Sequence, residues 1–283
     1  RSPFLDSLSP ATGSISDKFR FLRYLAAASR DEFTVADELA PLGNLYERVL
    51  KPFLSGVFLT DPAQVGAVSG KEIIRSFITG QPGLPTRGVG ELARKLASGI
   101  SRISYQRSVD SLAEFSRNPV IVATDVTTAA QLLDMPRLPK LASSITWYHE
   151  VPRDLTTSTL LRVDGLQRGL VINSIAISQI VPSYAPRGRA LLTSTTIDSA
   201  SESEVRRHLA TMWQSSTSEW SLIAKYEVPK SLPIFGKGAH PVTSAKIRDG
   251  VYVAGDYRTA PSQNGALLAG RLAAEELLLN QGT

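Results

Sequence analysis

The sequence predicts an α/β protein in which a partial Rossmann-like sheet, built from separated segments, adjoins an α+β region. Two observations predict the Rossmann-like part. PVIVATD (119–125) is a compact apolar run followed by a helical pattern over 126–133, and VYVAGD (251–256) is a second strand that leads into a long Ala/Leu-rich helix. A third observation predicts the α+β part, because helical patterns fill the first third and strand-like runs follow Pro139. We expect the two strand–helix units to pack together although they are far apart in the sequence.

Apolar residues at helical spacing predict helices before residue 100. Thr34 and Asp37 form a capping-box pattern before a short helix. Pro52 interrupts a strongly apolar helix and predicts a kink. Asp61-Pro62 combines an N-cap with Pro at the first helical position, which predicts a helix from there to Gly80. Further helices are expected at residues 15–25 and 89–99.

Strand-like runs separated by Gly, Pro and Asp turns dominate the next part of the chain. They are SSITWYHEV, TSTLLRV, GLVINSIAIS, GRALLTSTTI and EWSLIAKYEV, with one helix capped by Ser201 and Glu204 before the last of them. Residues 229–249 are rich in Pro and Gly and are expected to be loop. The chain therefore divides into a helical segment (1–80), a first Rossmann-like segment (81–140), a mainly antiparallel sheet with a helix (141–240) and a C-terminal Rossmann-like segment (241–283).

Composition restricts the function classes. Of the 283 residues, 42% are apolar and 20% charged, and the net charge of +5 is spread without a basic stripe, so no nucleic-acid partner is expected. The absence of Cys excludes disulfides, thiolate metal ligands and a cysteine nucleophile, and it fits a reducing cytoplasm. No apolar run reaches the roughly 18 residues that a transmembrane helix needs. The first residues lack a signal-peptide pattern and an initiator Met, which predicts a processed or truncated chain.

The end of the strand VYVAGD carries the residues that predict a ligand site. Gly255 and Asp256 follow the strand at its carboxyl end, where open α/β sheets bind ligands. A carboxylate there can accept hydrogen bonds from the hydroxyls of a sugar or a ribityl chain. Gly255 would allow the backbone to approach a ligand closely.

The loop and the helix that follow predict a site for a flat, electron-rich group. Pro261, Ser262 and Asn264 lead into the helix, whose free N–H groups and dipole favour negative charge. Gly265 and Ala266 remove side-chain bulk, so a flat ring can lie against the helix end. The competing interpretation is a terminal strand and an amphipathic helix joined by a Gly-Asp turn, with no ligand.

This stretch resembles the C-terminal FAD motif of the flavin-dependent amine oxidase superfamily. Three further segments, in matching order, resemble its protoporphyrinogen-oxidase and phytoene-desaturase-like branch: LYERVLKPFLSGVFLTDP, LPTRGVGELARKLASGI and VIVATDVTTAAQLL. Together they cover most of the chain from Leu45 onward. The resemblance implies an FAD cofactor, a partial FAD-binding domain and an oxidoreductase that removes a hydride equivalent from a C–N or C–C unit of an apolar or amine small molecule.

The resemblance also implies roles for individual residues. Asp256 would bind ribityl or phosphate-proximal hydroxyls, and the helix start at Asn264, Gly265 and Ala266 would face the pyrimidine edge of the flavin. The remaining implied contacts are Ala123 and Thr124 at the end of the first strand and Arg87, Gly88 and Gly90 near the ring or the substrate cavity. No acid or base is implied.

The superfamily begins with a βαβ unit carrying G-x-G-x-x-G, and nothing here matches that unit. The string from Gly88 to Ala93 reads G-x-G-x-x-A, but a Pro-rich loop precedes it instead of a strand, so we interpret it as the start of a helix. The chain is also short between Gly99 and Pro119. We therefore expect a truncated member that binds FAD poorly or not at all.

Other candidate groups are weaker. The histidines at 149, 208 and 240 are scattered without metal-ligand spacing, so we expect no metal site. Trp147 and Tyr148 are usual core aromatics, yet the resemblance implies that one of them can face the flavin.

Three functional interpretations stay open on the sequence alone. The first is the FAD-dependent oxidoreductase, and the second is a degenerate relative that acts as a non-catalytic binding module. The third is a peripheral membrane protein with a lipid entry lined by Phe53, Val57, Phe58 and Leu59. The oligomeric state is not predicted.

Overall fold

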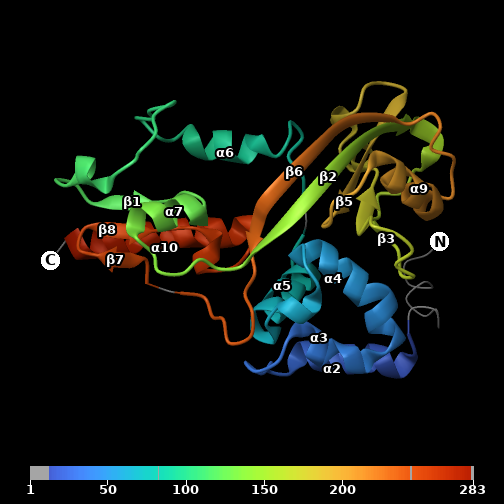
Figure 1. The fold of residues 1–283 in the computed structure, drawn as a ribbon, viewed down its shortest axis with the longest axis horizontal. Coiled ribbons are helices and arrows are strands. Elements are labelled where there is room, and N and C mark those ends of the chain that lie inside the picture. Colours follow the sequence, from blue (N-terminus) through green and yellow to red (C-terminus); the bar gives the residue numbers. More distant parts are fainter. Residues whose placement is uncertain (1–12, 82, 243, 282–283) are drawn as a thin grey trace.

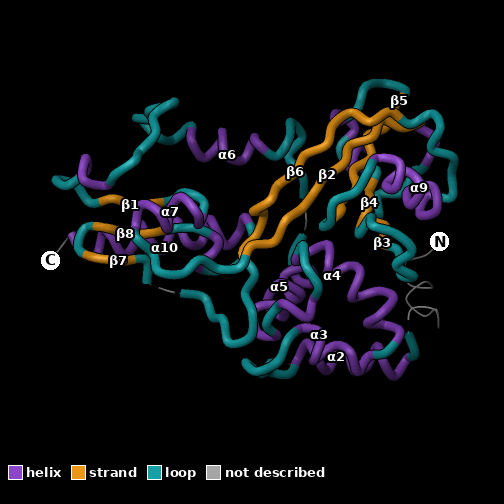
Figure 2. The backbone as a smooth tube through the Cα atoms, viewed as in Figure 1, coloured by secondary structure: helices purple, strands orange, loops and turns teal. Residues whose placement is uncertain are grey.

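The computed structural model describes residues 13–81, 83–242 and 244–281, so residues 1–12 of the first predicted segment lie outside the described residues. Figure 1 shows a small sheet with its helices at the C-terminal end, a long twisted sheet beside it, and a group of helices below. Figure 2 shows that loops connect these three parts repeatedly. The mixed α/β architecture confirms the predicted fold class.

The N-terminal helices pack into one apolar core. They are α2 (Ile15–Ala26), α3 (Val35–Leu39), α4 (Lys51–Phe58) and α5 (Ala67–Thr79). The core gathers Val35, Leu39, Leu54, Phe58 and Ile74, with Phe53 and Val57 packed against it. Capping boxes start α2 at Ser14 and α3 at Thr34, as helix N-termini require for their free N–H groups.

Two features of these helices differ in detail from the sequence expectations. A π-helical turn (Tyr46–Leu50) precedes α4, and Pro52, in the first turn of α4, has no N–H to donate to a preceding carbonyl. The helix expected from Pro62 is only a 3₁₀ turn (Pro62–Gln64) there, and α5 begins at Ala67. The reason is tertiary, because the Val65 carbonyl accepts from the Val35 N–H and Gly66 bridges to Thr34.

The five-stranded sheet has the order β3-β4-β5-β2-β6. Its strands are β2 (Leu141–Pro152), β3 (Arg162–Val163), β4 (Asn173–Ile175), β5 (Arg189–Thr196) and β6 (Ser221–Pro233), and all of its pairings are antiparallel. Helix α9 (Glu202–Trp213) covers one face, where its apolar stripe meets Trp147, Val151 and Leu192. A short helix, α8 (Ile177–Ile180), follows β4. Two predicted runs, TSTLLRV and GLVINSIAIS, are therefore strands only in part.

The three-stranded sheet has the order β1-β8-β7. β1 (Val120–Val122) and β8 (Val251–Val253) are parallel, and β7 (Lys246–Arg248), in a region expected to be loop, pairs antiparallel to β8. Helix α10 (Gln263–Gln281) packs on Tyr252 and Ala254, while α7 (Val126–Leu133) packs on Val122 and Val253. Because side chains alternate along a strand, the two helices cover opposite faces of the sheet.

Candidate flavin site

The carboxyl ends of β1 and β8 lie side by side. Val122 pairs with Val253, and the Ala254 N–H donates to the Val122 carbonyl at 2.9 Å. The chain after β1, Ala123 and Thr124, therefore ends at the same sheet edge as the chain after β8. This parallel pairing confirms that segments far apart in the sequence form one sheet. It also creates the edge at which open α/β sheets bind ligands.

Asp256 follows β8 at this edge as a half-buried carboxylate. Burial raises its pKa, an effect that the neighbouring Tyr257 N–H opposes. Among the described residues, none forms an ion pair with it. A partly buried carboxylate without a neighbouring cation is a strong hydrogen-bond acceptor, and it can accept further hydrogen bonds from a ligand.

Gly255 has a different structural role from the one expected. A Cβ at this position would overlap the ring of Tyr257, which folds back over the glycine. The backbone is extended there, with φ 170, so the glycine is not needed for a left-handed turn. The space beside Gly255 is therefore filled by Tyr257 rather than kept for a ligand. Tyr257 was not singled out from the sequence, and no pattern in the sequence marks its position.

The start of α10 is organised by its own loop. The Ser262 hydroxyl accepts from the Gly265 N–H at 3.0 Å, which caps the helix. A Cβ at Gly265 would overlap the Ala260 carbonyl, so the packing of this loop by itself requires a glycine here. Asn264 and Ala266 are exposed on the helix surface. The first N–H groups of α10 that Ser262 does not use stay available to an anion or a polarised carbonyl.

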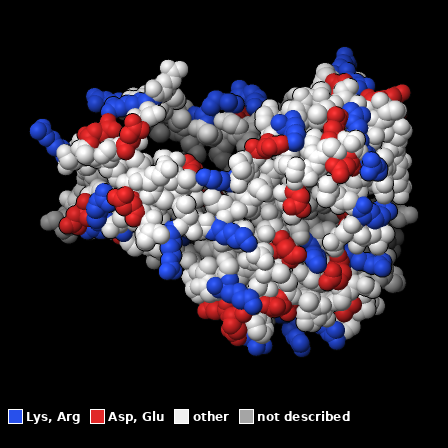
Figure 3. All heavy atoms as spheres, in the orientation of Figure 1, with Lys and Arg blue, Asp and Glu red and all other residues white. Residues whose placement is uncertain are grey.

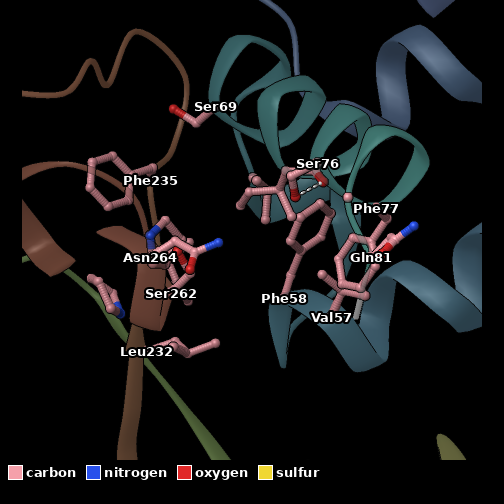
Figure 4. Close-up of a pocket in the computed structure, with 16 residues that line it drawn as sticks. Val57, Phe58, Ser69, Ser76, Phe77, Gln81, Leu232, Phe235, Ser262 and Asn264 are labelled. Atoms are coloured by element: carbon pink, nitrogen blue, oxygen red, sulfur yellow. Dashed lines mark hydrogen bonds between the residues drawn. The ribbon is translucent and has the colours of Figure 1, made fainter. Parts of the chain in front are cut away.

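A cavity of about 350 Å³ opens between the start of α10, helices α4 and α5, and the end of β6. Figure 4 shows Asn264 and Ser262 on one side and Val57, Phe58, Phe77 and Gln81 on the other. Its lining is mostly apolar; the full set is Val57, Phe58, Val65, Ser69, Ile73, Ser76, Phe77, Gly80, Gln81, Leu232, Pro233, Ile234, Phe235, Pro261, Ser262 and Asn264. The sequence analysis missed the walls from α5 and β6, because only the tertiary fold brings them to α10.

The residues expected to form a lipid entry are mostly in the helical core or at this cavity. Phe58 is 5% exposed in the core, Phe53 and Val57 pack against it, and Val57 and Phe58 also line the cavity. They therefore form no exposed patch, and a membrane surface at these residues is not supported. None of the helices in the described part of the chain combines the length and apolar character that crossing a membrane would need.

The segment with Arg87, Gly88 and Gly90 stands apart from the sheet edge. It leads into α6 (Gly90–Ala97), where the exposed Arg87 pairs with Glu91. The segment is held to the five-stranded-sheet region, because the Ser183 hydroxyl donates to the Thr86 carbonyl at 2.7 Å. In Figure 3 the surface is hollowed between the α6 segment and the rest of the molecule. The structure thus does not bring Arg87 into contact with Asp256 or the start of α10.

Trp147 and Tyr148 lie on opposite faces of β2. Trp147 is 1% exposed, packs under α9 and donates from Nε1 to the Thr196 hydroxyl, so the expectation that it faces the flavin is wrong. Tyr148 faces away from α9, half-buried, with its ring edge-on to Tyr226 at 5.9 Å between centroids. Burial raises the pKa of Tyr148. Of the two aromatics, Tyr148 alone is available on the face opposite the core.

The fold is shared with several solved structures. The structure superposes with a TM-score of 0.67 on an oxidoreductase from Methanosarcina mazei (14% identity, 94% of this chain and 74% of that one). A protein from Pyrococcus furiosus superposes with a TM-score of 0.67, at 15% identity over 95% of this chain and 73% of that one. Reduced UDP-galactopyranose mutase superposes with a TM-score of 0.61, at 12% identity over 93% of this chain and 73% of that one. No curated protein matches the chain.

The sequence also matches a family model. The matched family is described as flavin containing amine oxidoreductase, and the match covers residues 5–278, which confirms the superfamily expected from the C-terminal motif. Its description supports a flavin cofactor and an oxidoreductase activity. The chain belongs to the flavin containing amine oxidoreductase family.

Proposed function

We propose that this chain is an FAD-dependent oxidoreductase that removes a hydride equivalent from a C–N or C–C unit of an apolar or amine small molecule. The sequence resemblance favours the protoporphyrinogen-oxidase and desaturase-like branch. The observation that carries the proposal is Asp256, the half-buried, unpaired carboxylate at the carboxyl end of β8. Such a group suits the ribityl or phosphate-proximal hydroxyls of a flavin, because each hydroxyl donates to the carboxylate and replaces lost water.

The start of α10 supports the same assignment. Its N-terminal N–H groups and dipole favour negative charge, and Asn264 and Ala266 are exposed on its first turns. When bound, FAD would supply the two-electron oxidation, in which the substrate gives up one hydride and one proton. The chain's own residues orient the ring, stabilise negative charge at its pyrimidine edge and exclude water from the apolar cavity. Ala123 and Thr124 would contribute backbone at the neighbouring strand end.

The adenosine half of FAD has no matching residues on this chain. Within the described residues, β1 pairs only with β8, so its other edge is an open strand edge of the mixed three-stranded sheet. An open strand edge is a place where another strand can pair. We infer that a βαβ unit at this edge would complete the FAD site. It can come from a further segment or from another chain.

The open edge also favours a second candidate function. A relative without the dinucleotide-binding unit would hold ligands in the cavity without turnover, as a binding module. Bound flavin and substrate-dependent flavin reduction separate the two functions. The first requires both, and the second requires neither.

The experiment is a titration of FAD with the purified chain, followed by flavin fluorescence and the visible spectrum. We expect saturable, weak binding that Asp256→Asn weakens by about 10-fold, because a charged acceptor is lost. The matched control is Asp249→Asn, an exposed carboxylate paired with Lys246 in the turn before β8. Equal binding by the two variants, or no saturable binding by the parent chain, would reject the assignment of Asp256.

A further inference from the structure

We propose that the cavity beside α10 takes an uncharged, largely apolar substrate that presents a hydrogen-bond acceptor to Asn264, and that it excludes protonated amines. This inference rests on the proposed oxidoreductase function and selects between its two substrate classes. The relevant observation is the lining of the cavity, whose walls come from α4, α5, the end of β6 and the start of α10.

None of the sixteen described residues that line the cavity carries a charge. A protonated amine needs a carboxylate or several oriented acceptors when it leaves water, since an uncompensated buried charge is strongly unfavourable. Asp256, the acidic residue of the flavin site, is not part of the lining. The cavity thus offers no counter-ion to an ammonium group, while its apolar walls favour a hydrocarbon skeleton.

The polar side chains of the lining are all neutral: the hydroxyls of Ser69, Ser76 and Ser262 and the amides of Gln81 and Asn264. The hydroxyl of Ser69 donates to the Ala239 carbonyl, and that of Ser76 donates to the Ile73 carbonyl, so both donors are already used. The side-chain amide of Asn264 forms no hydrogen bond with another described residue and, in Figure 4, projects toward the cavity. An amide N–H₂ beside an apolar space matches a carbonyl, ether or hydroxyl oxygen of a neutral ligand.

Two helix ends meet this cavity and act on a bound charge in opposite directions. The N-terminus of α10 carries partial positive charge, which disfavours a cation. The C-terminus of α5 carries partial negative charge, but several of its last carbonyls are occupied. Ile73 accepts from the Ser76 hydroxyl, Arg75 from the Thr79 hydroxyl, and Ser76 from the Gly80 N–H. On the α10 side of the cavity the helix end therefore disfavours an ammonium group, and the end of α5 adds only neutral carbonyls and no carboxylate.

The test compares two ligands of similar size, one neutral and one positively charged. 2-Naphthalenemethanol is neutral, and 2-naphthylmethylamine is protonated at pH 7. Isothermal titration of the purified full chain should show the alcohol binding at least about 10-fold more tightly than the amine. Phe77→Asp, which places a carboxylate at the half-exposed rim, should narrow or reverse this ratio. Ile78→Asp is the matched control, because Ile78 is the next residue of α5, is exposed and does not line the cavity.

The outcomes separate this inference from the proposed function. Tighter binding of the amine by the parent chain overturns the inference, and so does an unchanged ratio in a folded Phe77→Asp variant. Competition between lumiflavin and the alcohol also overturns it, because the ring itself would then occupy the cavity, while the flavin assignment would stand. If the chain binds the alcohol selectively but binds no flavin, the inferred neutral ligand class stands and only the proposed oxidoreductase function is rejected.

Discussion

His208 and Asp164 are joined by a hydrogen bond of 2.9 Å between Nε2 and Oδ2, inside the region of the five-stranded sheet. The other ring nitrogen, Nδ1, accepts from the Val171 N–H at 3.0 Å, so the neutral ring carries its proton on Nε2. Asp164 also accepts from Arg168. Burial raises the pKa of Asp164, but these hydrogen bonds outweigh it and hold the pKa well below its usual range. The imidazole thus ties α9 to the loop that precedes β4.

Replacing His208 should therefore destabilise the protein without touching the flavin site. His208→Leu leaves the Val171 N–H without a partner and removes one hydrogen bond from the buried Asp164 carboxylate, which keeps those from Arg168. We expect a loss of about 1–3 kcal/mol in the free energy of unfolding. Urea denaturation measures it. Arg207→Ala, an exposed change on the same helix, should stay within about 0.5 kcal/mol of the parent. A His208→Leu chain as stable as this control would show that the network contributes little.

His149 should make stability depend on pH. The ring is fully buried, and neither nitrogen has a hydrogen-bond partner within the described residues. Burial lowers the pKa of His149 from 6.5 to about 4, with a further contribution from Arg206; Glu202, whose Oε1 is 3.8 Å from Nε2, opposes them. Between those two values the unfolded chain binds the proton and the folded chain does not. Stability therefore falls as the pH decreases from about 6.5 toward 4.

The variant His149→Leu should remove much of that decrease. We expect the parent to lose up to about 3 kcal/mol between pH 7.5 and pH 4.5, and the variant to lose clearly less. Urea unfolding at a series of pH values gives both curves. Leu279→Ala provides the control, because this 74% exposed residue of α10 does not titrate and its replacement should leave the shape of the parent's curve unchanged. Parallel curves for the parent and His149→Leu would contradict the assignment.

Two glycines of α10 should respond oppositely to alanine. Gly265→Ala places a methyl group onto the Ala260 carbonyl, so the loop must move and flavin binding should weaken together with stability. Gly270→Ala meets nothing within 4 Å and should stabilise the helix by about 0.5–1 kcal/mol. Thermal unfolding and FAD titration of the two variants check this contrast. Similar effects of the two substitutions would mean that the loop is not packed as described.

Lys71 and Glu38 should behave as a coupled pair. Lys71 is 3% exposed, and its Nζ is 3.5 Å from Glu38 Oε2 and 4.0 Å from the centroid of the Tyr24 ring. Burial lowers the pKa of Lys71, and Glu38 opposes that effect. Each single variant, Lys71→Met or Glu38→Gln, should destabilise by about 2–4 kcal/mol, and the double variant by less than their sum. Additive losses in urea denaturation would show that the two residues act independently.

Local patterns were sufficient for much of the fold. The capping boxes at Thr34 and Ser201 and the strand–helix unit ending at Leu133 match the structure, because these signals depend on neighbouring residues. The late start of α5 and the strand β7 were missed. The start of α5 depends on pairing with the distant Val35, which no local pattern encodes. Strand β7 is different, because it forms a local hairpin with β8 across Asp249-Gly250, and the Asp-Gly turn that signals it was not used.

The candidate site was predictable only in outline. The position of Asp256 at a strand end follows from the order of apolar and polar residues. The sequence explained Gly255 and Gly265 by a ligand, and the structure adds a second reason for each, because a Cβ would overlap Tyr257 at one position and Ala260 at the other. The cavity wall from α5 and the burial of Trp147 under α9 follow from packing between elements, so the sequence alone held no signal for them.

The pairing of β1 with β8 has a consequence for synthesis in the cell. Val122 meets Val253, so the ribosome must make most of the chain before the small sheet can close. Until then the apolar strand β1 has no partner strand among the described residues. Contacts between residues so far apart in the sequence form slowly. Ligand binding at the proposed flavin site would then be a late event, and an interrupted translation product would have the helical core without the sheet edge that we propose for the cofactor.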